Sequence, residues 1–292
     1  MPFLPDSYSS PIGLPFNRAS LEQHLTFSTP DQDPGGPGVW LMLQSGQMMI
    51  KNIEGQIELP VDEQPPLLST DSITPLYLGE WQGQPCRLLS VPHDAQLSQE
   101  LKAESLLARD PQLPLELLSL GGLGNMILHW EKVSHNCGNC SEPMERLPGE
   151  WGKRCTSCNA LHFPRIHPCI IVLIRKGDEL LLVRKPEWLE KRFGLVAGFV
   201  DFGENLEEAV VREVREEVGL EVKNIRYVGS QSWPFPSQLM TGFVADYVSG
   251  EIILEEKELA EAAWYHKDQL PTLPPRRSIA RYLIDAAVES DN

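Results

Sequence analysis

Four cysteines in the middle of the chain constrain its fold more than any other feature. They form two Cys-x-x-Cys pairs, Cys137 with Cys140 and Cys155 with Cys158, and fourteen residues separate the pairs. Four thiolates at this spacing can surround one ion, and no coordination position is left for water or substrate, as in structural zinc sites. Metal binding would supply folding energy that so short a segment cannot draw from a core. Two redox-active pairs, or thiols that are close by chance, are the alternative.

The cysteine segment divides the 292-residue chain into three parts. We expect an N-terminal mixed α/β domain over 1–130, a zinc ribbon over 131–163 and a second α/β domain over 164–292. In the first domain the pattern predicts strands over 39–44, 48–53 and 74–81 and a helix over about 96–110. In the last domain it predicts a hairpin over 166–185, strands over 195–200, 225–233 and 239–248, an acidic segment ending in a strand over 255–266, and a helix over 276–290.

The composition excludes some classes of function. The formal net charge is −16, whereas proteins that hold nucleic acids mainly by their phosphates are usually basic. DNA is therefore not an expected partner. No apolar run reaches the ~20 residues of a membrane span, and the N-terminus lacks the pattern of a signal peptide. We expect a cytoplasmic protein.

An acidic helix is predicted in the third part of the chain. Asn205 can cap its N-terminus, with Glu208 closing a capping box, and Gly219 stands where a C-terminal glycine belongs. The helix should therefore span about 206–218. An apolar stripe should pack on the sheet, and it consists of Val210, Val211, Val214 and Val218.

Three carboxylates gather on another face of this helix. Glu213, Glu216 and Glu217 are three or four residues apart or adjacent, so they are neighbours that repel one another. A hard divalent cation such as Mg²⁺, which takes oxygen ligands, would compensate them if the face is partly buried. From spacing alone, a solvated acidic face and a metal site explain the cluster equally well.

The complete pattern from Gly198 to Leu220 resembles the Nudix box, G-x5-E-x7-R-E-U-x-E-E-x-G-U, where U is aliphatic. Every specified position is met, including Glu204 and Arg212. The resemblance implies a Nudix hydrolase with an α/β/α sandwich. Such enzymes use Mg²⁺ or Mn²⁺ to cleave a nucleoside diphosphate linked to another moiety.

A second motif follows about ten residues later. The stretch from Ser230 to Ser237, SQSWPFPS, resembles the SQPWPFPxS motif of the NADH pyrophosphatase branch, with Ser232 in place of a proline. The prolines restrict the backbone, and the aromatic rings can stack on a base. A proline-rich turn with two core aromatics is the alternative. The resemblance implies substrate contacts for Gln231, Ser232, Trp233, Pro234, Phe235, Pro236, Ser237 and Gln238.

Further residues match single positions of the same branch. Glu258 matches a distal metal-binding glutamate, and Ala197 matches a position whose carbonyl helps to bind metal. Glu150, Phe163 and Ala280 match substrate-contacting positions.

The resemblance implies hydrolysis of NAD(H) to NMN(H) and AMP, and of NAD-capped RNA 5′ ends to NMN and 5′-monophosphate RNA. Metal held by Glu213, Glu217 and Glu258 would activate water, with Glu217 or Glu216 accepting its proton. The resemblance also implies a homodimer. One alternative is an ADP-ribose or general dinucleotide pyrophosphatase. The other is a zinc-ribbon RNA-binding protein with an inactive Nudix domain.

Overall fold

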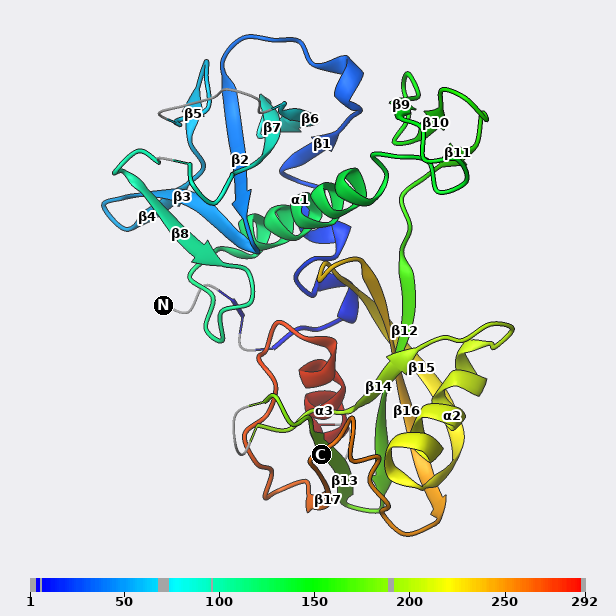
Figure 1. The fold of residues 1–292 in the computed structure, drawn as a ribbon. Helices are drawn as coiled ribbons and strands as arrows, with labels where there is room; N and C mark the ends of the chain where they lie inside the picture. Colours follow the sequence, from blue (N-terminus) through cyan, green and yellow to red (C-terminus); the bar gives the residue numbers. More distant parts are fainter. Residues whose placement is uncertain (1–3, 6, 68–73, 96, 189–191, 290–292) are drawn as a thin grey trace. The chain divides into compact units, whose positions relative to one another are not determined.

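The computed structural model describes residues 4–5, 7–67, 74–95, 97–188 and 192–289. They divide into two units, shown as a ribbon in Figure 1. The first unit holds residues 18–165 and 234–237, and the second holds 5–17, 166–233 and 238–289. The N-terminal segment thus belongs with the C-terminal domain, which the sequence did not predict. Of the described helices, none is long and apolar enough to cross a membrane.

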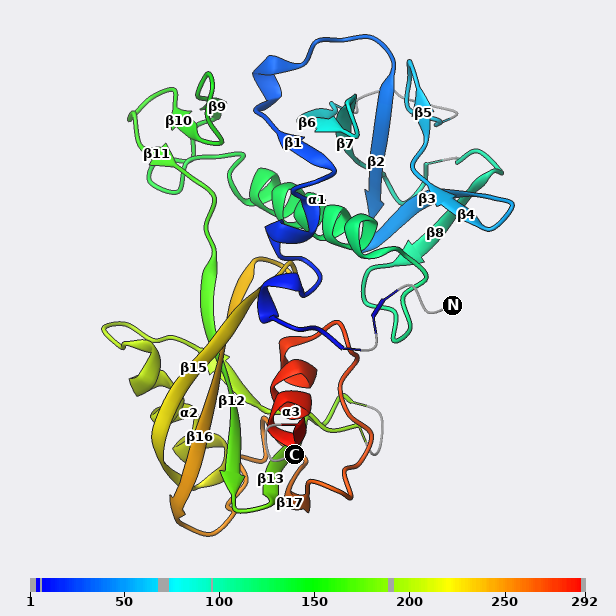
Figure 2. The same ribbon diagram turned by 180° about the vertical axis from the view of Figure 1, so that it is seen from behind.

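A mixed sheet forms the body of the first unit (Figures 1 and 2). Its main path runs β1-β6-β7-β2-β3-β4, with β5 added to β2 and β8 to β3. The pair β2–β7 is parallel, and the other pairs are antiparallel. The predicted strands over 39–44, 48–53 and 74–81 are confirmed. The strands are β1 (Leu25–Phe27), β2 (Gly38–Gln44), β3 (Gln47–Ile53), β4 (Gln56–Glu58), β5 (Val61–Asp62), β6 (Leu76–Trp81), β7 (Gln84–Ser90) and β8 (Leu101–Ser105).

The helix expected over about 96–110 is wrong. Among the described residues of this stretch, Leu101–Ser105 form β8, which pairs with β3. The helix of this unit is α1 (Leu115–Val133), so the domain boundary expected at 130 falls within it. At Gly124 a Cβ would lie 2.8 Å from a methyl group of Leu41 and 2.9 Å from one of Leu43. Glycine thus allows α1 to lie close against β2.

The cysteine segment forms a small sheet of its own, in the order β11-β10-β9. Its strands are β9 (Met144–Arg146), β10 (Lys153–Cys155) and β11 (Leu161–His162). Glu131 of α1 joins it to the helix, because its carboxylate lies 2.9 Å from Lys153 Nζ and 2.7 Å from Arg146 Nη2. Lys153 is buried and also lies over the Trp130 ring.

The second unit is built on a sheet in the order β15-β16-β12-β13-β17, with β14 paired to β12. The pair β12–β16 is parallel, and the others are antiparallel. The predicted hairpin, strands and C-terminal helix are confirmed within the described residues. The elements are β12 (His167–Lys176), β13 (Glu179–Arg184), β14 (Val196–Phe199), α2 (Leu206–Val218), β15 (Glu221–Trp233), β16 (Gln238–Ser249), β17 (Glu261–His266) and α3 (Ile279–Glu289).

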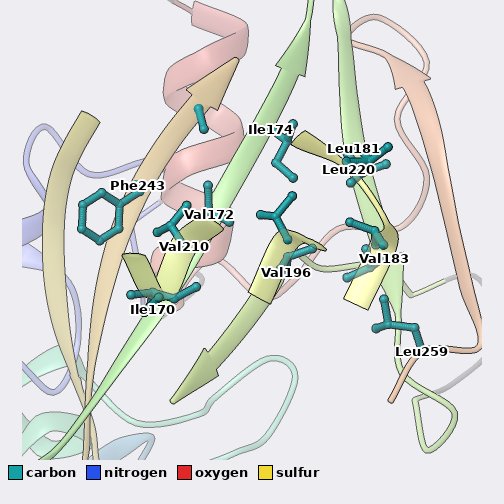
Figure 3. Close-up of a cluster of buried hydrophobic side chains, with 14 residues drawn as sticks. Ile170, Val172, Ile174, Leu181, Val183, Val196, Val210, Leu220, Phe243 and Leu259 are labelled. Carbon is teal, nitrogen blue, oxygen red and sulfur yellow. The ribbon is translucent and has the colours of Figure 1, made fainter. Parts of the chain in front are cut away.

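Helices cover both faces of this sheet. Alternate residues of β12 point to opposite sides: Ile170, Val172 and Ile174 pack with α2, whereas Ile171 and Leu173 pack with α3. Figure 3 shows the cluster on the α2 side, which is closed by side chains of β13, β14 and β16. The predicted α/β/α sandwich is confirmed, and it carries the acidic helix on one face.

Candidate active site

Helix α2 begins and ends as its sequence predicts. The Asn205 side chain accepts a hydrogen bond from Glu208 N, and the Glu208 carboxylate accepts one from Asn205 N. Gly219 ends the helix with φ 70°, a conformation that glycine adopts without strain. Val210, Val214 and Val218 are fully buried against the sheet. Val211 is only half-buried, and Ala209 completes the buried stripe instead.

Arg212 organises the carboxylates around the start of the helix. Its guanidinium donates to both oxygens of Glu204, at 2.6 and 2.9 Å, and to Glu213 and Glu216 at 2.8 and 3.0 Å. It also donates to the carbonyl of Phe199. Hydrogen bonds from Arg212 and from the backbone of Asp201 lower the pKa of Glu204 to about 2. Arg212 therefore orients carboxylates rather than offering itself to a phosphate.

Gly198 leaves room for the Glu213 carboxylate. It lies on β14 beneath α2, and a Cβ at this position would collide with the carboxyl group of Glu213. Glu213 is 8% exposed. Burial is the main cause that raises its pKa, and the Arg212 guanidinium opposes the shift. The glycine of the box is thus required by the space that a buried carboxylate occupies.

Glu217 is the most strongly perturbed carboxylate of the cluster. It is 2% exposed, and neither carboxylate oxygen has a hydrogen-bond partner. Burial raises its pKa to about 8, and the Lys185 charge only partly opposes this shift, to which Glu213 and Glu258 add. A buried carboxylate without a donor is costly unless a cation compensates it. The donor set of two buried carboxylates beside a third acidic residue fits a hard divalent cation.

The other predicted metal ligands come from two further elements. Glu258 is exposed and follows a segment that backbone hydrogen bonds attach to the end of α2, from Ile253 N to Val218 O and from Glu255 N to Glu217 O. Its charge acts on both Glu213 and Glu217. Ala197 precedes Gly198 on β14 and is half-buried. The predicted ligands thus all belong to the second unit.

The four paired cysteines converge in the first unit. The sulfur atoms of Cys137, Cys140, Cys155 and Cys158 all lie within 4.8 Å of one another. Backbone N–H groups of Ser157 and Cys158 donate to Cys155 Sγ at 3.4 Å, and these bonds lower the pKa of its thiol to about 6. Four sulfur atoms this close together can surround one ion, and the cluster fits structural zinc.

The aromatic motif divides between the two units. Trp233 ends β15 in the second unit and is half-buried, whereas residues 234–237 group with the first unit. Within the first unit, Asn125 of α1 donates to the Pro234 carbonyl at 2.6 Å. Phe235 is half-buried and Pro236 is exposed, while Ser237 is 3% exposed.

Four predicted substrate residues are buried: Gln231, Pro234, Ser237 and Ala280. Gln231 is completely buried and uses both amide hydrogens, donating to the carbonyls of Pro15 and Arg277, while its oxygen accepts from Ile279 N. The Gln231 side chain therefore ties elements together and has no hydrogen left for a ligand. Ala280 packs in the core beneath α3 and is 8% exposed. Ser237 is equally enclosed.

The remaining predicted substrate residues are accessible. Glu150 and Phe163 are exposed in the first unit, the latter at 46%. Ser232 and Gln238 are half-buried at the ends of β15 and β16. Glu150 and Phe163 thus belong to the first unit, whereas Ser232 and Gln238 belong to the second unit, as do Glu213, Glu217 and Glu258.

Sequence reasoning missed Lys185, whose charge acts on Glu217, and Cys169, whose pKa is raised to about 11 by burial and by the charge of Glu213. Cys169 lies on β12 and Lys185 directly follows β13, and both precede the box in the sequence. The pattern of the box carries no signal for either.

Three domain families match the chain. They are a NUDIX domain at residues 165–287, an NADH pyrophosphatase-like rudimentary NUDIX domain at 37–130 and an NADH pyrophosphatase zinc ribbon domain at 137–163. The N-terminal domain thus matches a family described as a rudimentary NUDIX domain. That relationship was not predicted from the sequence.

Curated relatives match over most of the chain. A protein of Pseudomonas aeruginosa named NAD-capped RNA hydrolase NudC is 39% identical over 85% of this chain and 88% of its own. Proteins of the same name from Salmonella typhi and Klebsiella pneumoniae are 40% and 42% identical, over 84% and 73% of this chain and 94% and 80% of their own. With all three domains matched as well, the chain belongs to the Nudix hydrolases, in the NudC branch.

Proposed function

We propose that this protein hydrolyses the pyrophosphate bond of NAD(H), giving NMN(H) and AMP. On NAD-capped RNA the same bond is cut, which releases NMN and leaves a 5′-monophosphate end. The names of the relatives and the two NADH pyrophosphatase-type domains support this substrate class. The observation that carries the chemistry is the pair of buried carboxylates, Glu213 and Glu217, of which Glu217 has no hydrogen-bond partner.

The buried pair is suited to a catalytic Mg²⁺ or Mn²⁺ ion. Glu213, Glu217 and Glu258 would hold it together with the carbonyl of Ala197. Such an ion supplies charge neutralisation for the pyrophosphate and increases the acidity of water. Burial between α2 and the sheet keeps competing water away from Glu213 and Glu217, so that their charges act strongly.

Two carboxylates can accept the proton of the attacking water. Glu217 lies in the buried part of the cluster, beside Glu213. Glu216 is more exposed and receives a hydrogen bond from Arg212, which holds it in place. Trp233 and Phe235 would stack on a base of the dinucleotide. This would position its pyrophosphate bond relative to Glu216 and Glu217.

Product analysis tests the proposal. Wild-type protein with Mn²⁺ should convert NADH to NMNH and AMP, and NAD-capped RNA to NMN and 5′-monophosphate RNA. Glu217→Gln should lower kcat about 10³-fold or more while the circular dichroism spectrum is unchanged. Glu207→Gln, at an exposed position of the same helix, is the matched control and should retain activity.

Two results would contradict the proposal. ADP-ribose turnover equal to that of NADH, with no dependence on Trp233, would favour a general dinucleotide pyrophosphatase. RNA binding without metal-dependent cleavage would favour a binding protein with an inactive Nudix domain, although all the glutamates of the box are present.

The proposal extends to assembly and location. We infer a cytoplasmic homodimer from the family resemblance. Light scattering of the purified protein at several concentrations would test the dimer, and a monomer that remains fully active would refute its functional role.

A further inference from the structure

Residues 10–17, here called the N-terminal strap, pack in the second unit against β15. They include a short 3₁₀ helix, η1 (Pro11–Gly13), and form the dark blue segment near β15 and α3 in Figures 1 and 2. All three matched domains lie elsewhere, the first beginning at residue 37. The strap contacts the part of β15 that leads into the aromatic motif.

Two hydrophobic contacts hold the strap in place. Leu14 is fully buried and joins the core beneath α3, together with Ile279 and Leu283. Pro11 lies directly over Gly229, where a Cβ would collide with its ring. The strap therefore sits on β15 at a position where the strand carries no side chain.

Asn17 completes the exposed edge of β15. This strand is at the end of the sheet, so one row of its backbone groups lacks a neighbouring strand. The Asn17 side chain accepts from Ser232 N at 2.8 Å and donates to the Ser230 carbonyl at 3.2 Å. It also donates to the Pro11 carbonyl at 2.9 Å. One side chain thus fixes the backbone of the residue immediately before Trp233.

Phe16 contacts Trp233 directly. Their ring centroids are 5.7 Å apart and the planes meet at 89°, the edge-to-face geometry that aromatic pairs prefer. Phe16 is 6% exposed and has φ 71°, which is unusual for a bulky residue. Such a conformation persists only where surrounding contacts impose it. Here they come from Leu14 and Asn17 on either side, and from Gln231, which donates to the Pro15 carbonyl.

We propose that Phe16 and Asn17 are positioning residues that hold Trp233 in the orientation needed to stack on a base of the substrate. The inference rests on the proposed function, because only there does Trp233 contact substrate. Without the strap, the end of β15 would lose its edge partner and the indole would lose the ring that packs against it. The substrate would then have to restrict Trp233 itself on binding, which lowers affinity rather than the rate of the chemical step.

Kinetics of strap variants test the inference. Asn17→Ala should raise KM for NADH about tenfold while kcat changes by less than about twofold. Asn17→Asp keeps the acceptor for Ser232 N but loses the donor groups. Its KM should therefore lie between those of wild type and Asn17→Ala. Asn224→Ala is the control, because it removes a side-chain hydrogen bond to Asp246 at the other end of the same strand. Its KM should match wild type.

A double-mutant cycle separates positioning from general damage to the fold. If Asn17 acts through Trp233, then Asn17→Ala should add nothing to the KM of Trp233→Ala. An unchanged KM in Asn17→Ala would overturn the inference. So would a double variant whose increase in KM is the product of the increases in the two single variants. An unchanged KM in Trp233→Ala would instead refute the substrate role of Trp233 on which the inference rests.

Fluorine NMR gives a readout that needs no catalysis. The chain contains seven tryptophans, and Trp233→Phe would identify the resonance of Trp233 in 5-fluorotryptophan-labelled protein. Phe16→Leu and Asn17→Ala should each shift or broaden that resonance, whereas Asn224→Ala should not. A resonance unaffected by either strap variant would overturn the inference. Absence of NADH hydrolysis in wild type would refute the proposed function, and the resonance would still report whether the strap positions Trp233.

Discussion

At the scale of single residues, spacing could place carboxylates together but could not tell which are buried. Glu213, Glu216 and Glu217 look alike as neighbours on a helix, yet Glu216 is exposed while Glu213 and Glu217 lie against the sheet. The difference depends on how α2 sits on β14 and β12, which are contributed by another part of the chain. The Nudix resemblance therefore predicted a metal-binding role for Glu213 and Glu217, and the structure shows that these two are the buried ones.

The raised pKa of Glu217 predicts that, without added divalent cations, the free energy of unfolding depends on pH. An unfolded glutamate ionises near pH 4.5, whereas the native one holds its proton to about pH 8. The native state thus binds more protons between these values, so stability falls as pH rises through this window. Glu217→Gln removes the dependence and should be more stable than wild type above pH 8, by up to about 5 kcal/mol, but not near pH 4.5.

Denaturant unfolding at pH 5 and pH 8.5 would measure this difference. Addition of Mg²⁺ should stabilise wild type at pH 8.5 but not the variant, because the cation compensates the ionised carboxylate. A stability difference that is the same at both pH values would contradict the assigned burial of Glu217.

At the scale of elements, the sequence predicted correctly those features that depend on contacts between residues close in sequence. The caps of α2 are hydrogen bonds within a few residues, so Asn205, Glu208 and Gly219 marked its ends correctly. The stretch containing β8 favours a helix by composition, but pairing with β3, some fifty residues earlier, makes it a strand. Long-range pairing overrides local preference there, and no local pattern records it.

Gly198 provides a test of how closely β14 and α2 approach each other. Gly198→Ala would drive a methyl group into the Glu213 carboxylate and displace it from its place beside Arg212. We expect hydrolysis to fall at least about 100-fold, with unfolding free energy lowered by about 1–3 kcal/mol. Gly138→Ala is a suitable control, because no atom lies within 4 Å of a Cβ there. Activity near wild type in Gly198→Ala would show that Glu213 need not occupy this space.

At the scale of the whole molecule, the zinc ribbon should be the part of the first unit that depends on a metal. Its sheet is too small to bury a core, and its four sulfur atoms already lie within 4.8 Å of one another. Protein purified without added metal should contain about one zinc ion per chain by elemental analysis. Cys155→Ser should lose most of it and lower the melting temperature, whereas Cys86→Ser, at a buried cysteine outside the cluster, should keep the zinc. Equal zinc content in both variants would contradict the assignment.

The acidity of the whole chain predicts that it binds the RNA phosphates beyond the cap only weakly. Basic proteins that make several phosphate contacts lose about 10³-fold or more in affinity between 50 and 200 mM salt, because binding releases counterions. With a net charge of −16, this chain should gain little from RNA phosphates beyond the cap. Raising KCl across that range should therefore change kcat/KM for NAD-capped RNA by less than about threefold, and in parallel with that for NADH, which has no RNA body. A steep fall of kcat/KM with salt for the capped RNA but not for NADH would show instead that a local basic surface, not the cap alone, binds this substrate.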